Sequence, residues 1–231
     1  MKKKNLICLT TLSLILIMLF VSIPITTVCA SNYDQKHLIA KNAKENIYLY
    51  YDKESDGMYK GFYLKSGSKV KHFDWESSTS SSAVISVSAL KGNYIAVICT
   101  TGTGSGVHTE NLYILNKKTL KELKIENPLD VLKDNVISKI DAPVVKIKID
   151  NNTWTSTCPD TELSHFFNTV GYESIIQYDL QDTYFTVTLP AQVAPAFFIG
   201  EFKLTYKWKS KSSTFIPTAI NFNFEDAAVK Y

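Results

Sequence analysis

Hydrophobic and polar residues alternate with a period of two along much of the chain. In residues 201–209, large apolar side chains occupy every second position between charged residues and threonine, and residues 145–149 and 220–224 repeat the pattern. A period of two puts alternate side chains on opposite faces of a strand, whereas an amphipathic helix has a period near 3.6. These three segments are therefore predicted to be strands with one buried face.

A different pattern marks residues 94–115. Residues 94–99 and 112–115 are almost continuously apolar and rich in β-branched and aromatic residues, which indicates strands buried on both faces. The glycine-rich segment 102–106 lies between them. Because so much glycine carries an entropic cost in a tight connection, we expect a bulged or wide turn rather than a plain two-residue hairpin.

The fold class is predicted from the short connections between strand-like segments and from the scarcity of helical patterns. About a dozen strand-like segments follow one another with hairpin-length links, which favours antiparallel neighbours. One short helix is expected at residues 129–134, where Asn127 and Pro128 give a helix start, and a second helical turn at 160–168. The sequence predicts an all-β, mostly antiparallel sandwich or roll with one or two short helices. A partial, propeller-like N-terminal half is the alternative.

The first 30 residues have the physical pattern of an export signal. Three lysines precede a long apolar run, and small residues stand before Ala30, which predicts cleavage between Ala30 and Ser31. An uncleaved membrane anchor and lipidation at Cys29 are the alternatives. We expect residues 1–30 to be a signal peptide, 31–45 a tether and 46–231 a single all-β domain, with a subdivision near residue 150 left open.

The numbers of acidic and basic residues indicate which kinds of molecule the protein is expected to bind. The chain has 25 Lys plus Arg and 22 Asp plus Glu, and it contains no arginine. Removal of the three signal lysines leaves 22 positive and 22 negative residues, so the mature net charge is near zero. Without arginine there is no bidentate fork for phosphate or carboxylate. Nucleic acid is therefore not an expected partner, and the membrane is expected only through the signal segment before cleavage.

Two cysteines, Cys99 and Cys158, remain after the signal peptide. In an exported protein an even pair suggests a disulfide. A bridge would close a loop of about 60 residues and would stabilise the fold by about 4 kcal/mol in the chain-entropy model. The alternative is two unbridged thiols, with Cys99 packed in the strand core.

The glycine-rich loop is the candidate binding site. Its backbone N–H groups could form an anion-binding nest, although the segment matches neither a phosphate-binding loop nor a nucleophile elbow. A purely structural turn is the alternative. The candidate ligand-binding residues are Thr101, Gly102, Thr103, Gly104, Ser105, Gly106 and His108.

Other chemistry has little support in the sequence. Ser105 and His108 could act as nucleophile and base only with an orienting group, for which Glu110 is the local candidate. Glu173 and Asp179 could form a carboxylate pair of the kind that hydrolyses glycosides. The four histidines have no metal-ligand spacing, and no cofactor fingerprint is present, so neither a metal nor a cofactor is expected.

Residues 96–98, 101–107 and 112–115 together resemble a known motif. The pattern AVI, TGTGSGV and LYIL, with Phe73-Asp74-Trp75 upstream, is similar to exported Gram-positive domains of unknown function. Those domains resemble degenerate FG-GAP or VCBS repeat units, or the extracellular domains of sensor peptidases of the beta-lactam-resistance regulator type. The resemblance covers residues 46–150. This chain lacks the family's aspartate-rich calcium segment before the central strand.

Together these observations predict a secreted or cell-surface protein of a Gram-positive bacterium. We expect a non-catalytic extracytoplasmic binding or sensing module whose partner is a cell-envelope component or an exported protein. An extracellular hydrolase and a structural cell-surface protein are the alternatives. A rigid scaffold that holds a glycine-rich loop is the feature that favours binding.

Overall fold

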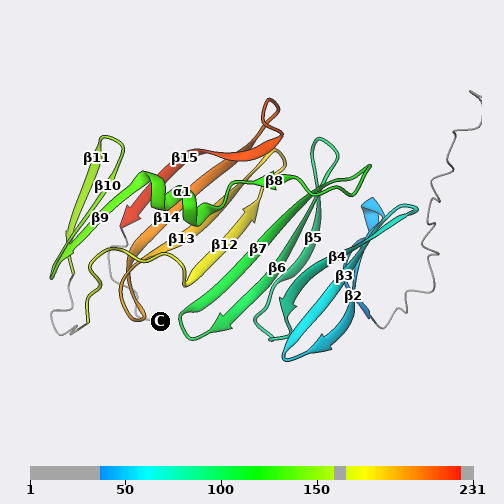
Figure 1. The fold of residues 1–231 in the computed structure, drawn as a ribbon, viewed down its shortest axis with the longest axis horizontal. Coiled ribbons are helices and arrows are strands. Elements are labelled where there is room, and N and C mark those ends of the chain that lie inside the picture. Colours follow the sequence, from blue (N-terminus) through cyan, green and yellow to red (C-terminus); the bar gives the residue numbers. More distant parts are fainter. Residues whose placement is uncertain (1–36, 159–164, 225–231) are drawn as a thin grey trace, which may run out of the picture. The chain divides into compact units, whose positions relative to one another are not determined.

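The protein is mostly β and mostly antiparallel, as the sequence predicts (Figure 1). The computed structural model describes residues 37–158 and 165–224, and the signal peptide with its cleavage site lies outside them. The described residues belong to one compact unit. No helix in this described part of the chain is long and apolar enough to cross a bilayer.

The strands form three sheets, and most strands pair with their neighbours in sequence. A four-stranded meander contains β1 (Leu38–Asn42), β2 (Ile47–Ser55), β3 (Met58–Ser66) and β4 (Lys69–Ser78). A three-stranded meander contains β9 (Val136–Asp141), β10 (Val144–Ile149) and β11 (Asn152–Thr157). The eight-stranded sheet contains, in spatial order, β5 (Ile85–Leu90), β6 (Tyr94–Gly104), β7 (Val107–Asn116), β12 (Ile175–Leu180), β13 (Tyr184–Ala194), β14 (Phe197–Lys209), β15 (Thr214–Phe224) and β8 (Lys124–Ile125).

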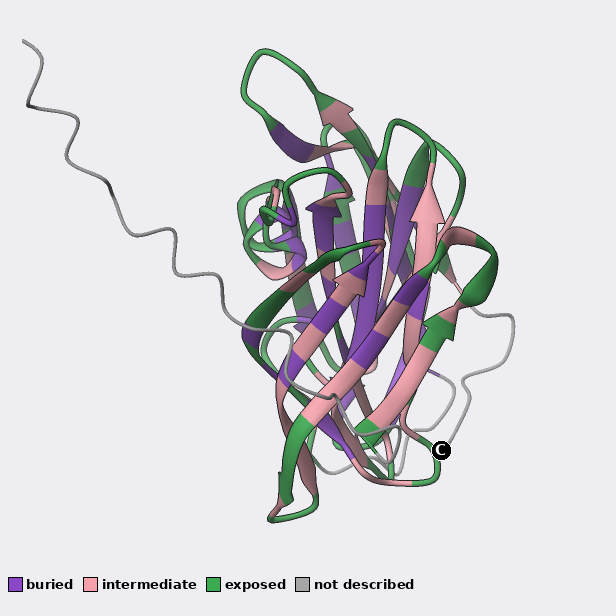
Figure 2. Cartoon of the chain, turned by 90° about the vertical axis from the view of Figure 1, so that its right-hand side faces the viewer, coloured by how far each residue is buried: buried purple, intermediate pink, exposed green. Residues whose placement is uncertain are grey.

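Two hydrophobic cores lie against opposite faces of the eight-stranded sheet. One core joins Val97 and Cys99 of β6 to the inner face of the four-stranded sheet, where Phe62 and Trp75 are buried. The larger core joins the other face to the three-stranded sheet and to the helix α1 (Pro128–Asn135). Figure 2 shows that buried residues follow the strands and exposed residues gather at the turns. The eight-stranded sheet is therefore the middle layer.

The β6–β7 hairpin contributes residues to both cores because its successive side chains point to opposite faces of the sheet. Ala96 and Ile98 of β6 belong to the larger core, while their neighbours Ile95 and Val97 belong to the smaller one. This confirms the expectation that residues 94–99 are buried on both faces. It also explains why the segment shows no polar alternation.

The expected short helix is present. In α1 the Asn127 side chain accepts a hydrogen bond from the Leu129 N–H at 2.9 Å, and Pro128 occupies the first turn, where its missing N–H costs nothing. Residues 159–164, on which most of the second predicted helical turn falls, are not described. Residues 165–168 are not helical.

Two segments differ from expectation. Residues 38–42, predicted to be part of a tether, form β1 and pair with β2, so the sheet begins before residue 46. Residues 190–199 are apolar without alternation, a pattern that predicts a connecting segment which caps the end of the core, but they belong to β13 and β14, which are separated by a two-residue turn. Their apolar side chains, among them Val193 and Phe197, are core positions of paired strands.

A buried tyrosine hydroxyl in the larger core generates the first prediction. Tyr206 is fully buried, its ring stacks on Phe185 at a centroid distance of 4.9 Å, and its hydroxyl has no hydrogen-bond partner among the described residues. An unpaired buried hydroxyl opposes folding. Tyr206→Phe should therefore raise the free energy of unfolding by about 1 kcal/mol in urea denaturation.

Thr100→Val is the matched control for that prediction. The buried Thr100 hydroxyl accepts from the Val84 N–H at 2.7 Å and donates to the Val84 carbonyl at 3.1 Å. Its removal should lower the free energy of unfolding by about 1–3 kcal/mol. A loss of stability in Tyr206→Phe would show that the Tyr206 hydroxyl is hydrogen-bonded in the folded protein.

Candidate binding site on the central hairpin

The glycine-rich segment is a hairpin end rather than an open loop. β6 continues through Gly104, β7 begins at Val107, and only Ser105 and Gly106 form the turn, with Gly106 at a φ of 71°. A bulge interrupts the pairing between Thr100 and Gly102. The expectation of a bulged or wide turn in place of a two-residue hairpin is therefore wrong: the strands keep pairing through two of the glycines, the turn has two residues, and the bulge lies in β6 instead.

Close contact between the two strands explains one of those glycines. A Cβ atom on Gly102 would lie 2.5 Å from the Thr109 hydroxyl oxygen, which is too short for any real contact. The Thr101 hydroxyl lies 3.3 Å from both the carbonyl and the hydroxyl oxygen of Thr109. Gly104 has no such restriction, since the nearest heavy atom to its Cβ position is 4.0 Å away. Gly102 is therefore required by packing, and Gly104 is not.

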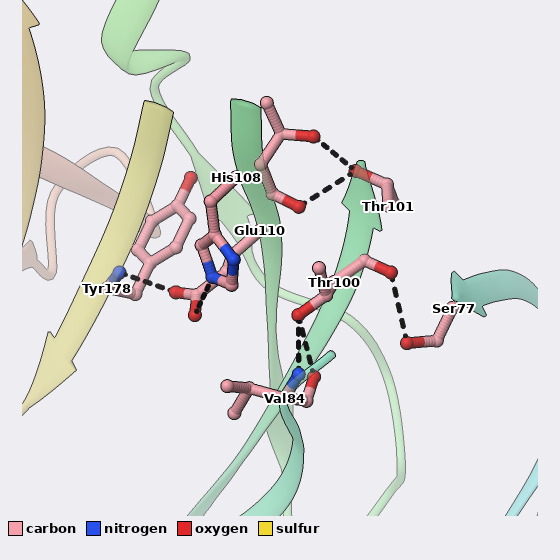
Figure 3. Close-up of polar contacts among 8 residues, drawn as sticks. Ser77, Val84, Thr100, Thr101, His108, Glu110 and Tyr178 are labelled. Carbon is pink, nitrogen blue, oxygen red and sulfur yellow. Dashed lines mark hydrogen bonds and ion pairs between the residues drawn. The ribbon is translucent and has the colours of Figure 1, made fainter. Parts of the chain in front are cut away.

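A buried carboxylate lies beside the hairpin end (Figure 3). Glu110 is 6% exposed, on the same face of β7 as His108. One carboxylate oxygen lies 3.1 Å from His108 Nε2, and the other accepts from the Tyr178 backbone N–H at 2.8 Å. Burial and the Glu110 charge raise the pKa of the Tyr178 phenol. The carboxylate is thus held in place from two directions.

The Glu110 carboxylate lies at the point where the parallel strands β7 and β12 stop pairing. β7 and β12 pair only at His108 with Ile175 and at Thr109 with Ile176. Beyond this point the Glu110 side chain, rather than the β7 backbone, satisfies the Tyr178 N–H. Glu110 and Tyr178 line a cleft of about 360 Å³ together with the chain that leads into α1. The remaining lining residues are Asn111, Leu112, Tyr113, Ile125, Glu126, Asn127, Pro128, Leu129 and Ile176.

Only some of the predicted site residues contact one another in the structure. Thr101 is engaged with Thr109, Thr103 pairs with His108 across the ladder, and Ser105 is exposed at the turn. His108 is hydrogen-bonded to Glu110, and no hydrogen bond among the described residues joins it to Ser105. The hairpin end and the cleft are therefore joined through His108 and Glu110.

Sequence reasoning missed the cleft itself. The usable signal was an acid, Glu110, two residues before the apolar run of β7. Tyr178 and Ile176 come from β12, about 60 residues further on, and only the parallel pairing of β7 with β12 brings them close. Nothing in the local pattern of residues 175–180 indicates that pairing.

The other candidate groups do not assemble into a reactive site. Asp179 is exposed and accepts a hydrogen bond from Gln181, while Glu173 lines a different pocket beside α1. No group of three or more metal-binding side chains gathers among the described residues.

No disulfide joins Cys99 to Cys158. The two side chains are buried in different cores, Cys99 between the four-stranded and eight-stranded sheets and Cys158 in the larger core. Burial raises the pKa of the Cys99 thiol to about 12, so the thiolate is scarce at neutral pH. Cys99 is accordingly a packing residue.

Comparisons of the chain with models of known protein families, with curated proteins and with solved structures give no match. The resemblance of the glycine-rich motif to exported Gram-positive domains therefore stays a prediction.

The contact between Gly102 and Thr109 can be tested by a double variant. Gly102→Ala should lower the free energy of unfolding by about 1–3 kcal/mol because the added methyl group collides with the Thr109 hydroxyl. Thr109→Ala in the same chain should recover most of the loss, and Gly104→Ala should have little effect. Equal losses from the two glycine variants in urea denaturation would contradict this account.

The position of Glu110 predicts unequal effects of two substitutions. Glu110→Ala leaves the Tyr178 N–H without an acceptor and should lower the free energy of unfolding by about 2–3 kcal/mol. Glu110→Gln keeps an amide oxygen for this N–H and should cost clearly less. If both variants lose the same amount in thermal and urea denaturation, the hydrogen bond to Tyr178 does not hold the strands at this point.

Proposed function

We propose that this protein is a non-catalytic binding or sensing module that acts outside the cytoplasm. The β6–β7 hairpin end and the adjoining cleft would bind a cell-envelope component or an exported protein. Support for export comes from the charge pattern and apolar run of residues 1–30. Support for binding comes from the cleft beside Glu110, which is lined by strands and a helix start rather than by loose loops.

The observation that carries this proposal is the double attachment of the Glu110 carboxylate. A carboxylate that is fixed by His108 Nε2 and by the Tyr178 N–H presents a preorganised charge at the cleft without being free to move with a reacting group. Apolar Leu112 and Ile176 and the polar Asn127 line the same cleft. An apolar wall with a few fixed polar groups is the usual composition of a ligand site.

The hydrolase alternative has weaker support. A serine hydrolase needs its base within hydrogen-bond reach of the nucleophile. His108 is bonded to Glu110, as a base and its orienting acid would be, but no hydrogen bond among the described residues joins it to Ser105, which is exposed at the turn. A purely structural role at the cell surface would not account for the cleft beside Glu110. Binding is the function that uses the hairpin end, the fixed carboxylate and the cleft together.

Capture of partners from the organism's own cell envelope tests the proposal. The mature protein, beginning at Ser31, should retain a defined component, and Gly104→Val should lose it while keeping the fold, since a Cβ atom at Gly104 would have no heavy atom closer than 4.0 Å. Thr153→Val, at an exposed strand position of β11, is the matched control and should retain the component.

Two outcomes would contradict the proposal. If Gly104→Val folds and keeps every partner, the hairpin end is only a turn. If the protein degrades wall glycan or peptide and Ser105→Ala abolishes that turnover, the protein is a hydrolase.

A further inference from the structure

The opposite end of the β6–β7 hairpin carries a concentration of lysine. Four segments meet there: residues 43–46, 66–69, 91–93 and 116–121. Together they contain six lysines and one acid, Glu45, in a mature chain whose charges balance overall, and one of these lysines, Lys91, is ion-paired with Asp182 at 2.8 Å. The lysines are Lys44, Lys69, Lys91, Lys117, Lys118 and Lys121. Figure 1 shows η2 (Ala43–Glu45), the β3–β4 turn and the β5–β6 turn at the upper ends of their strands.

Hydrogen bonds fix these segments to one another. The Gly67 N–H donates to the Asn46 carbonyl at 3.0 Å, and the Lys117 N–H donates to the Asn93 carbonyl at 2.7 Å. The Lys69 ammonium donates to the Lys118 carbonyl. These hydrogen bonds hold the four lysine-bearing segments in fixed positions, and they connect the four-stranded sheet to the end of the eight-stranded sheet.

The segments line an open, shallow depression of about 620 Å³ that has no apolar side chain in its lining, and this depression is called the lysine pocket. Its charged residues are three lysines and Glu45, and the rest are serine, asparagine and glycine. The lining residues are Glu45, Asn46, Ser66, Gly67, Ser68, Lys69, Asn93, Lys117 and Lys118. Sites for small organic ligands are mostly apolar, so this lining fits a strongly hydrated, charged ligand instead.

The charges of the pocket are only partly neutralised. Lys117 Nζ lies 2.7 Å from a Glu45 carboxylate oxygen, and this hydrogen bond, together with the charges of Lys117 and Lys44, lowers the pKa of the Glu45 carboxyl. The ammonium of Lys118 is exposed and makes no hydrogen bond or ion pair with the described residues. An excess of positive charge thus remains in a concave surface, which favours anions.

We propose that this lysine pocket binds a polyanion that carries phosphate groups repeated along a flexible chain. Lysine binds phosphate as a point charge and needs no bidentate geometry. The pocket's lysines come from two separate segments, Lys69 from the β3–β4 turn and Lys117 and Lys118 from the segment after β7, and several separate positive charges suit a chain with repeated charges better than a single ion. No aromatic ring lines the pocket, so a ligand that depends on stacking of bases is disfavoured.

A membrane surface fits this pocket less well. Peripheral membrane binding combines basic residues with apolar side chains that enter the lipid. The exposed large hydrophobic residues of the described chain lie outside the four segments: Val84, Val107, Ile137, Phe167 and Tyr184. The pocket also lies at the far end of β6 and β7 from Ser105, so this proposal is independent of the function proposed for the hairpin end.

Binding of linear inorganic polyphosphate to the mature protein tests the proposal. In phosphate-free buffer at low salt, the protein should bind the polymer, and the affinity should fall steeply as salt rises. The double variant Lys69→Gln/Lys118→Gln should bind about tenfold more weakly and with a shallower salt slope. The double variant Lys203→Gln/Lys207→Gln, which removes two exposed charges from β14, is the matched control and should bind like the unchanged protein.

A variant that removes the negative charge of the pocket tests the sign of the effect. Glu45→Gln removes the one acid of the pocket and should tighten binding of polyphosphate. The proposal is overturned if the pocket and control variants lose affinity equally, if orthophosphate binds as tightly as the polymer, or if vesicles with anionic lipid bind while polyphosphate does not. Retained secondary structure by circular dichroism separates loss of binding from loss of fold.

Discussion

Burial of the β6–β7 hairpin on both faces is the constraint on which the rest of the structure depends. Its strands lie in the middle layer, and successive side chains enter opposite cores: Ile98 and Leu112 one core, Val97 and Leu115 the other. The four-stranded sheet buries its inner face against this hairpin, and the three-stranded sheet contributes to the core on the other face, where Trp154 of β11 packs against Phe222 of β15. A slip of one residue would exchange the two sets of side chains between cores of different shape, so the register is strongly specified.

The same constraint explains how much of the fold was predictable. Continuous apolar sequence at residues 94–99 can only be a two-sided strand or a buried helix segment, and its length and β-branched content decide for the strand. Asn127 and Pro128 fix the start of α1 through local chemistry that needs no partner. Strands with one solvent-exposed face were predictable from the alternation of apolar and polar residues, as in residues 145–149. These features depend on neighbours in sequence, which is why the sequence reveals them.

Features that depend on distant pairing were not predictable. β1 is short and follows a polar segment, and it becomes a strand because β2 offers an edge to pair with and the smaller core takes up Ile39 and Ala40. Residues 190–199 contain proline and alanine in a pattern without alternation, yet both faces of that part of the sheet exclude water, so strands are tolerated there. The cleft at Glu110 depends on the parallel contact of β7 with β12, which has no local signature. Tertiary context outweighs propensity in each case.

The two ends of the hairpin differ in chemistry because the strands that connect them leave no room for polar groups. Between Ile95 and Ile98 on β6, and from Leu112 to Leu115 on β7, the side chains are buried or packed against a core. Charged groups of the hairpin can therefore lie only where the strands emerge: Glu110 near one end, and Lys117 and Lys118 just beyond the other, where Lys117 pairs with Glu45. The rigid, apolar middle keeps these opposite charges apart and holds each set in a fixed geometry. A change in the core of the hairpin would therefore disturb both ends together, whereas a change at either end can alter its own surface alone.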